Sequence, residues 1–178
     1  HNVYQESYQF QIAADRWFKS VVFDSGMVES EESAHITIPE DALKLESSRR
    51  YYIRVQIRAA GEISEWYASD FTTALLSGAE WKAEFITVER ERDKEESRGS
   101  YLRKQVELTG EVESAYIHST ALGLYHLYIN GEKIGTDEFA PGWTSYNKHL
   151  LYQTYDVTEQ LKKGKNVIGA MVGAGWYK

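Results

Sequence analysis

Carboxylates are the most numerous groups in this sequence that could do chemistry, since the chain holds 27 Asp and Glu residues among 178. Two carboxylates on opposite sides of a bond can hydrolyse it, one as proton donor and the other as base or nucleophile. The densest acidic clusters, Glu29–Glu32 and Glu89–Glu96, fall in polar segments, and neither belongs to a catalytic motif. We therefore interpret both as solvated surface and predict no catalytic residue in this chain.

A second group of residues combines aromatic rings with oxygen atoms, in loops expected in the C-terminal half. Trp143 and Tyr146 are the aromatic pair, and Asn130 and Asp137 add an amide and a carboxylate. Rings stack on the apolar faces of sugars, and amide and carboxylate oxygens bind hydroxyls or calcium. A structural interpretation competes: Asn130 is explained by a turn, and Trp143 by packing under a long connection. For all four residues we favour the structural interpretation.

Other residue types exclude several kinds of chemistry and partner. The five His residues show no metal-ligand spacing, and we expect His118 and His126 to face water or a polar neighbour. Cys is absent, which excludes disulfides and thiolate sites and leaves the compartment undecided. The net charge of −7 disfavours nucleic acid as a partner. No apolar run approaches the ~20 residues that cross a bilayer, so we expect a soluble chain without a membrane partner.

The elements that must position these residues are short strands. Between Tyr51 and Ala59, apolar and polar residues alternate completely, which predicts a strand with one buried face. Arg54 and Arg58 lie on its polar face. The residues predicted to be buried are Tyr51, Ile53, Val55 and Ile57. Shorter strands of the same kind are predicted at Tyr8–Ile12, Val21–Phe23, His35–Ile38 and Tyr67–Thr72.

The segment Ser77–Ala79 interrupts the strand pattern, and we place a domain border there, giving domains 1–76 and 77–178. Asn130-Gly131 predicts a type I′ hairpin in the second domain. The predicted fold is all-β, with two consecutive antiparallel β-sandwiches. Because the chain stops soon after a strand, we expect a truncated second sandwich with apolar surface exposed near Trp176. Strands are predicted there at Leu102–Leu108, Ala115–Thr120, Leu124–Ile129, Leu151–Asp156 and Val167–Val172.

A series of motifs in the second half resembles a known family. In chain order they are Ala-Leu-Gly-Leu-Tyr (Ala121–Tyr125), Tyr-Ile-Asn-Gly (Tyr128–Gly131), Ala-Pro-Gly-Trp-Thr-Ser-Tyr (Ala140–Tyr146) and Gly-Ala-Gly-Trp-Tyr (Gly173–Tyr177). This order resembles the N-terminal β-sandwich of α-L-rhamnosidases, a galactose-binding or jelly-roll-like fold. The segment Tyr8–Leu76, with Phe-Asp-Ser-Gly and Ser-Glu-Trp, is similar to the fibronectin-III or immunoglobulin-like module that precedes it.

The resemblance implies a parent hydrolase that removes terminal α-linked rhamnose, using carboxylates in a helical barrel that this chain does not contain. The chain would then be an inactive scaffold whose partner is its own catalytic domain. Some family members hold rhamnose on this sandwich with calcium, which implies an alternative: a rhamnoside-binding module using Asn130, Asp137, Trp143 and Tyr146, with calcium near the first two. A third hypothesis is that the chain hydrolyses glycosides by itself, which an assay with a chromogenic rhamnoside would test.

Overall fold

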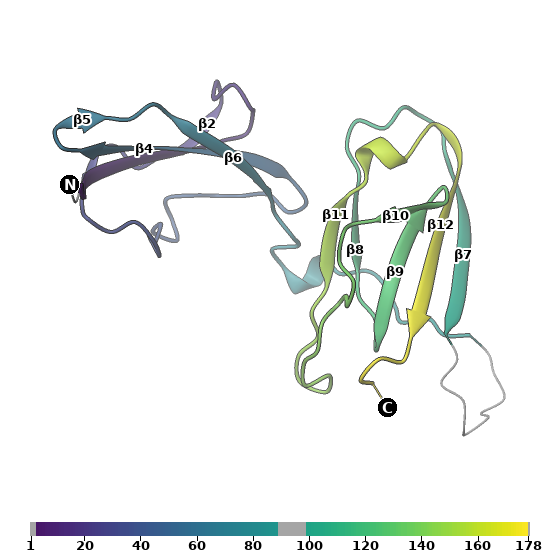
Figure 1. The fold of residues 1–178 in the computed structure, drawn as a ribbon. Helices are drawn as coiled ribbons and strands as arrows, with labels where there is room; N and C mark the ends of the chain where they lie inside the picture. The colour runs from purple at the N-terminus through teal and green to yellow at the C-terminus, as the bar shows by residue number, and fades with distance from the viewer. Residues whose placement is uncertain (1–2, 89–98, 178) are drawn as a thin grey trace. The chain divides into compact units, whose positions relative to one another are not determined.

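The structure, a computed structural model, describes residues 3–88 and 99–177. The chain divides into two compact units, His1–Trp81 and Lys82–Lys178, and each is built from antiparallel strands (Figure 1). The predicted all-β class is confirmed. The domain border after Leu76 stays a prediction, and the acidic cluster Glu89–Glu96 lies outside the described residues. No helix in the described part of the chain is long and apolar enough to span a membrane.

The first unit holds one sheet with two long strands at its centre. The first of these, β1, pairs with β2 and β3 on one side and with β4 on the other, and β4 also pairs with β5 and β6. All of these pairings are antiparallel. The strands are β1 (Gln5–Ala13), β2 (Val21–Asp24), β3 (Val28–Glu29), β4 (Arg50–Ala59), β5 (Glu62–Ile63) and β6 (Tyr67–Thr72).

An irregular segment, residues 30–49, covers the apolar face of this sheet (Figure 1). Its contacts reach the buried side chains Tyr8, Phe10, Ile12 and Tyr51. The strand predicted at His35–Ile38 is wrong, since His35 adopts a left-handed φ of 57° and the segment forms no ladder. Among the described residues of this unit, the irregular segment 30–49 thus forms the second layer, where the predicted sandwich would have a second sheet. Its covering side chains are Ile36, Ile38, Leu43 and Leu45.

The predicted alternation along β4 has the correct faces, but its burial is partly wrong. Tyr51 is buried and Ile53 packs against the core, whereas Val55 and Ile57 are 39% and 36% exposed. The sheet is narrow beside these two residues, because β5 has only two residues. Tyr67, the first residue of β6, pairs with Val55 and is itself 83% exposed. Alternation therefore identified the apolar face without showing how far it is covered.

The opposite face of β4 is polar but ordered. The Arg54 guanidinium lies between the rings of Phe18 and Trp66, 4.4 Å from each centroid. Its Nε also donates a hydrogen bond to Oε1 of Gln11, whose own amide nitrogen donates to Asp24. A cation–π contact at a partly exposed position contributes about 0.5–1 kcal/mol. This stack fixes the polar face of the first unit.

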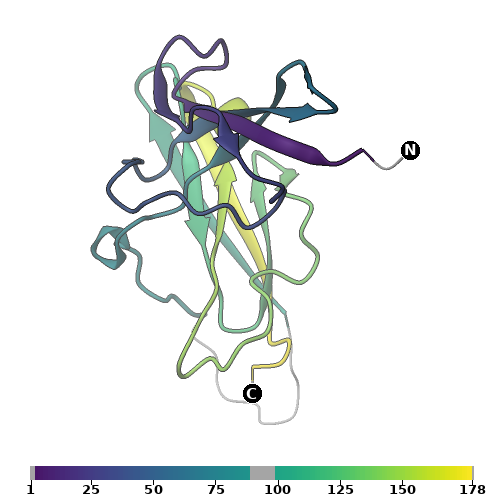
Figure 2. The ribbon, with the colours of Figure 1, turned by 90° about the vertical axis from the view of Figure 1, so that its left-hand side faces the viewer.

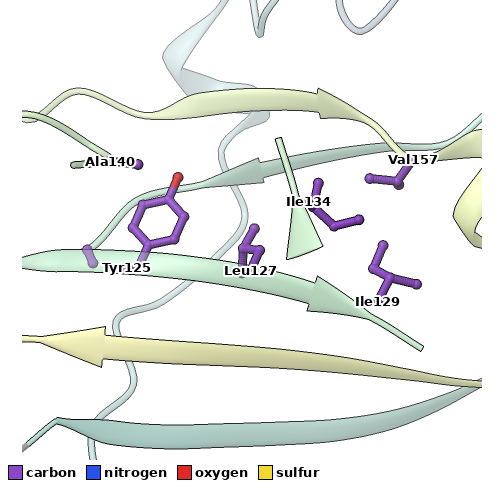
Figure 3. Packing of buried hydrophobic residues seen from close by; sticks show 7 residues of the cluster. Tyr125, Leu127, Ile129, Ile134, Ala140 and Val157 are labelled. Carbon is purple, nitrogen blue, oxygen red and sulfur yellow. The ribbon is translucent and has the colours of Figure 1, made fainter. Parts of the chain in front are cut away.

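The second unit has two sheets with its core between them. One sheet has the order β10-β9-β12-β7, and β11 pairs with β8 in the other. Tyr125, Leu127 and Ile129 project from one face of β9 toward Ile134 and Val157 (Figure 3). The elements are β7 (Ser100–Leu108), β8 (Tyr116–Ser119), β9 (Leu124–Ile129), β10 (Glu132–Ile134), β11 (Gln153–Asp156), β12 (Gly164–Gly173) and a 3-10 turn at Thr158–Gln160.

Candidate binding site in the second unit

Asn130 has a structural role in the second unit. It begins the predicted hairpin between β9 and β10, which is confirmed by positive φ angles of 52° at Asn130 and 96° at Gly131. Its Nδ2 donates to the Gln160 carbonyl and to Oδ1 of Asn166, and its Oδ1 accepts from the backbone N–H of Val167. Turn geometry and these three bonds account for an asparagine at this position.

Asn130 precedes β10 and Asp137 follows it, so the two residues lie at opposite ends of this strand. Oδ2 of Asp137 accepts a hydrogen bond of 3.0 Å from the Tyr155 hydroxyl. The three residues of β10 separate the two loops by about 10 Å, at roughly 3.3 Å per residue. The geometry therefore does not support a calcium ion held jointly by Asn130 and Asp137. No group of three or more His, Asp or Glu side chains within residues 3–88 and 99–177 is placed to hold a metal ion.

Trp143 and Tyr146 lie at the end of the unit where β12 finishes. The loop between β10 and β11 and the segment after β12 share this end (Figures 1 and 2). Trp143 stacks on Trp176 with ring centroids 6.3 Å apart, and Phe139 contacts Trp176 at 6.1 Å. We call Phe139, Trp143 and Trp176 the aromatic shelf. Beside it, the Tyr146 ring meets Tyr177 edge-on at 5.7 Å.

The shelf is exposed. The solvent-exposed fractions are 65% for Phe139, 74% for Trp143 and 49% for Trp176. The interpretation of Trp143 as a packed core residue is therefore wrong. The sequence predicts apolar surface near Trp176 but does not connect it with Phe139 and Trp143, because the three rings come together only through tertiary folding. Of the four predicted site residues, the structure groups Trp143 and Tyr146 and leaves Asn130 at the other end.

Close backbone contacts hold the base of the shelf. A Cβ on Gly123 would lie 2.2 Å from the Gly173 carbonyl oxygen, and one on Gly175 would lie 2.6 Å from Cγ of Leu124. Since these distances leave no room for a side chain, glycine is required at both places. The backbone N–H of Tyr125 also donates to the Ala140 carbonyl, at 2.9 Å. The two loops that carry the shelf are thus fixed to the start of β9.

A partly buried polar network surrounds the Tyr125 hydroxyl. The Tyr125 hydroxyl is 2.7 Å from Oγ of Ser119 and 2.8 Å from Oε1 of Gln153. Burial raises the pKa of Tyr125, against a smaller opposite effect of its bond to Ser119. Burial, and then the nearby Tyr125 and Asp137, hold the pKa of Tyr155 well above its usual range. Both phenols therefore stay neutral in the folded unit and serve packing and hydrogen bonding.

The raised pKa of Tyr155 predicts that the second unit loses stability in alkaline solution. Above about pH 10 the unfolded chain ionises Tyr155 while the folded chain keeps the proton, so the free energy of unfolding decreases as pH rises. In Tyr155→Phe this decrease should be smaller, measured by urea unfolding at about pH 9 and 11. Tyr101→Phe, at a 76% exposed position, is the control. An equal pH dependence in wild type and Tyr155→Phe would contradict the prediction.

The two predicted-strand histidines have polar neighbours, as expected. Nδ1 of His118 lies 2.9 Å from the Thr154 hydroxyl, and Nε2 of His126 lies 3.3 Å from the Glu138 carbonyl. Neither is grouped with other metal ligands in the described residues. These histidines are part of the structural framework of the unit.

Family comparisons cover most of the chain. Residues 1–77 match the Rha78A-like, N-terminal immunoglobulin domain, and residues 110–178 match the alpha-L-rhamnosidase N-terminal domain. Over 63 residues, 35% of this chain and 6% of the relative, the sequence is 51% identical to an alpha-L-rhamnosidase of Streptomyces avermitilis. An alpha-L-rhamnosidase of Alteromonas sp. (strain LOR) is 31% identical over 191 residues, covering 97% of this chain and 20% of that protein.

A solved structure shows the same fold. The alpha-L-rhamnosidase from Dictyoglumus thermophilum is similar with a TM-score of 0.82 and 30% identity, over 99% of this chain and 22% of that one. The chain thus spans about a fifth of the length of this protein and of the Alteromonas relative.

Proposed function

Because this chain belongs to the α-L-rhamnosidases, whose N-terminal immunoglobulin domain and following N-terminal domain it carries, we propose that it is the non-catalytic region of a rhamnose-releasing hydrolase. Its role is that of a scaffold for a catalytic domain further along the parent chain. The observation that carries this proposal is the match of the two N-terminal domain families, one to each unit, in a chain about a fifth as long as its relatives.

An activity assay tests the catalytic half of this proposal. A full-length parent enzyme should release the chromophore from a chromogenic α-L-rhamnoside, and residues 1–178 alone should not. Turnover by the isolated chain, in proportion to its concentration, would instead support the hypothesis that this region is itself the hydrolase. For the scaffold role, the parent without residues 1–178 should unfold at a lower temperature than the full-length protein. Equal melting temperatures would contradict a scaffold.

The alternative function is rhamnoside binding at the second unit, and one observation favours it. Trp143 is 74% exposed and stacks on Trp176, which gives an open ring surface of the kind that pairs with the apolar face of a sugar. Of the four site residues predicted from the sequence, this alternative function uses only Trp143 and Tyr146, which lie at the same end of the second unit. Calcium is included in the binding test below as a separate component, since the geometry does not bring its two predicted ligands, Asn130 and Asp137, together.

Trp143→Ala distinguishes the two functions. Since Trp143 is exposed, its replacement should change the free energy of unfolding by less than about 0.5 kcal/mol. A scaffold predicts no heat when L-rhamnose is titrated into the wild-type chain, with or without calcium. A rhamnoside-binding module predicts heat that Trp143→Ala abolishes and that Trp17→Ala, at a 68% exposed position in the first unit, leaves intact. Unfolding caused by Trp143→Ala would show that the side chain is structural.

A further inference from the structure

The aromatic shelf is an unusual surface for a soluble domain. Single exposed apolar residues are common on proteins, whereas adjacent large rings mark places where another surface binds. Phe139, Trp143 and Trp176 come from two loops and contact one another at 6.1 and 6.3 Å, with at least 49% of each side chain exposed. Aromatic side chains bury 150–250 Å² each when covered, so covering the shelf has a large favourable effect.

The shelf is also organised before anything binds to it. At Gly123 and Gly175, the start of β9 and the segment after β12 lie so close that neither position has room for a Cβ. The loop of Phe139 and Trp143 is held to β9 by the hydrogen bond from the Tyr125 N–H to the Ala140 carbonyl. The backbone N–H of Gly142 donates to the Phe139 carbonyl, and that of Tyr177 donates to the Ala174 carbonyl. A surface whose loops are already fixed loses little conformational entropy on binding. This arrangement favours an interface that is formed permanently.

The polar groups next to the shelf favour an apolar occupant over a sugar. The Asp137 carboxylate accepts from Tyr155, and the Glu138 carboxylate accepts a 2.7 Å bond from Nζ of Lys133. A sugar would need such groups for its hydroxyls, and these two already bond to neighbouring side chains of the unit. An apolar protein surface needs few polar partners at the centre of its contact.

The length of the relatives indicates where such a surface comes from. The chain matches about a fifth of the Dictyoglumus structure and of the Alteromonas protein. In a parent enzyme of that length, the segment after residue 178 continues directly from Trp176 and Tyr177, two residues at the shelf. A surface on the same chain is present at high effective concentration, so a small patch is sufficient for docking.

We propose that the aromatic shelf of Phe139, Trp143 and Trp176 is the docking surface for the part of the parent enzyme that follows residue 178. This inference rests on the proposed scaffold function and names the surface that performs it. The shelf is covered in the full-length enzyme and open in the isolated chain. Its three rings form the centre of that interface.

Hydroxyl-radical footprinting of the isolated chain and of a full-length parent enzyme tests the proposal without a variant that could fail to fold. Oxidation of Trp143 and Phe139 should be roughly fivefold slower in the full-length enzyme, since the centre of an interface is packed as densely as a protein interior. Trp17, which is 68% exposed and belongs to the first unit, is the internal control and should react at equal rates in both.

Each of three other results would overturn the proposal. Equal oxidation of Trp143 in the two proteins would show that the shelf stays open. Protection of Trp143 in the isolated chain by L-rhamnose would make it a sugar site, and protection that grows with chain concentration would make it a contact between copies. None of these results alters the rhamnosidase assay, so failure of the docking surface and failure of the proposed function are distinguishable.

Discussion

Replacing Gly123 with Ala is expected to destabilise the second unit by about 3 to 5 kcal/mol. The added Cβ would lie 2.2 Å from the Gly173 carbonyl oxygen and 2.9 Å from that of Ala174. Both obstacles are backbone atoms at the end of β12, so neither can rotate away as a side chain would. In addition, the φ of +114° at Gly123 is a conformation that residues with a side chain rarely adopt. The loss is a large fraction of the 5–15 kcal/mol that stabilises a typical domain.

Gly110→Ala is the matched control for this change, because a Cβ on Gly110 would have no atom within 4 Å and its φ is not positive. Urea unfolding of both variants and of the wild type gives the free energies directly. Gly123→Ala should unfold at a much lower urea concentration, while Gly110→Ala should remain close to wild type. If the two variants were equally stable, the tight contact between the start of β9 and the end of β12 would be disproved.

Replacing Asn166 with Ala is expected to cost about 2 to 4 kcal/mol. Asn166 has no exposed surface, and its amide makes four hydrogen bonds. Oδ1 accepts from the backbone N–H of Lys162 and from Nδ2 of Asn130, while Nδ2 donates to the carbonyls of Lys162 and Gly164. Alanine would remove all four and leave buried polar groups without partners, which is more costly than the loss of the bonds alone.

Asn147→Ala, on the exposed surface of the same unit, is the control and should be nearly neutral. A double-mutant cycle sharpens the prediction. Because Asn130 and Asn166 bond to each other at 3.0 Å, the losses from Asn130→Ala and Asn166→Ala should not add when both are made. Additive losses, or a near-neutral Asn166→Ala, would contradict the prediction that the hydrogen bonds of Asn166 link the β9–β10 hairpin to β12.

The sequence by itself determined the features that depend on neighbouring residues. The hairpin at Asn130-Gly131 follows from backbone freedom at two adjacent positions. The turn after β11 is equally local, since Oδ1 of Asp156 accepts from the backbone N–H of Thr158, two residues further along the chain. Alternation along β4 identified its apolar face, because side chains of a strand point to opposite sides in turn. The all-β class follows from the number of such strands.

Tertiary structure alone decided which of these faces and side chains are covered. Alternation assigned Val55 to the same face as Tyr51, but its burial depends on neighbouring strands and covering chain, which are distant in sequence. Asn130 was identified as a turn residue, and its bonds to Asn166 required β12 to lie beside β9. The candidate site differs from its prediction for the same reason. Trp143 and Trp176 meet because antiparallel pairing of β9 with β12 brings two loops to one end, and no local pattern encodes that contact.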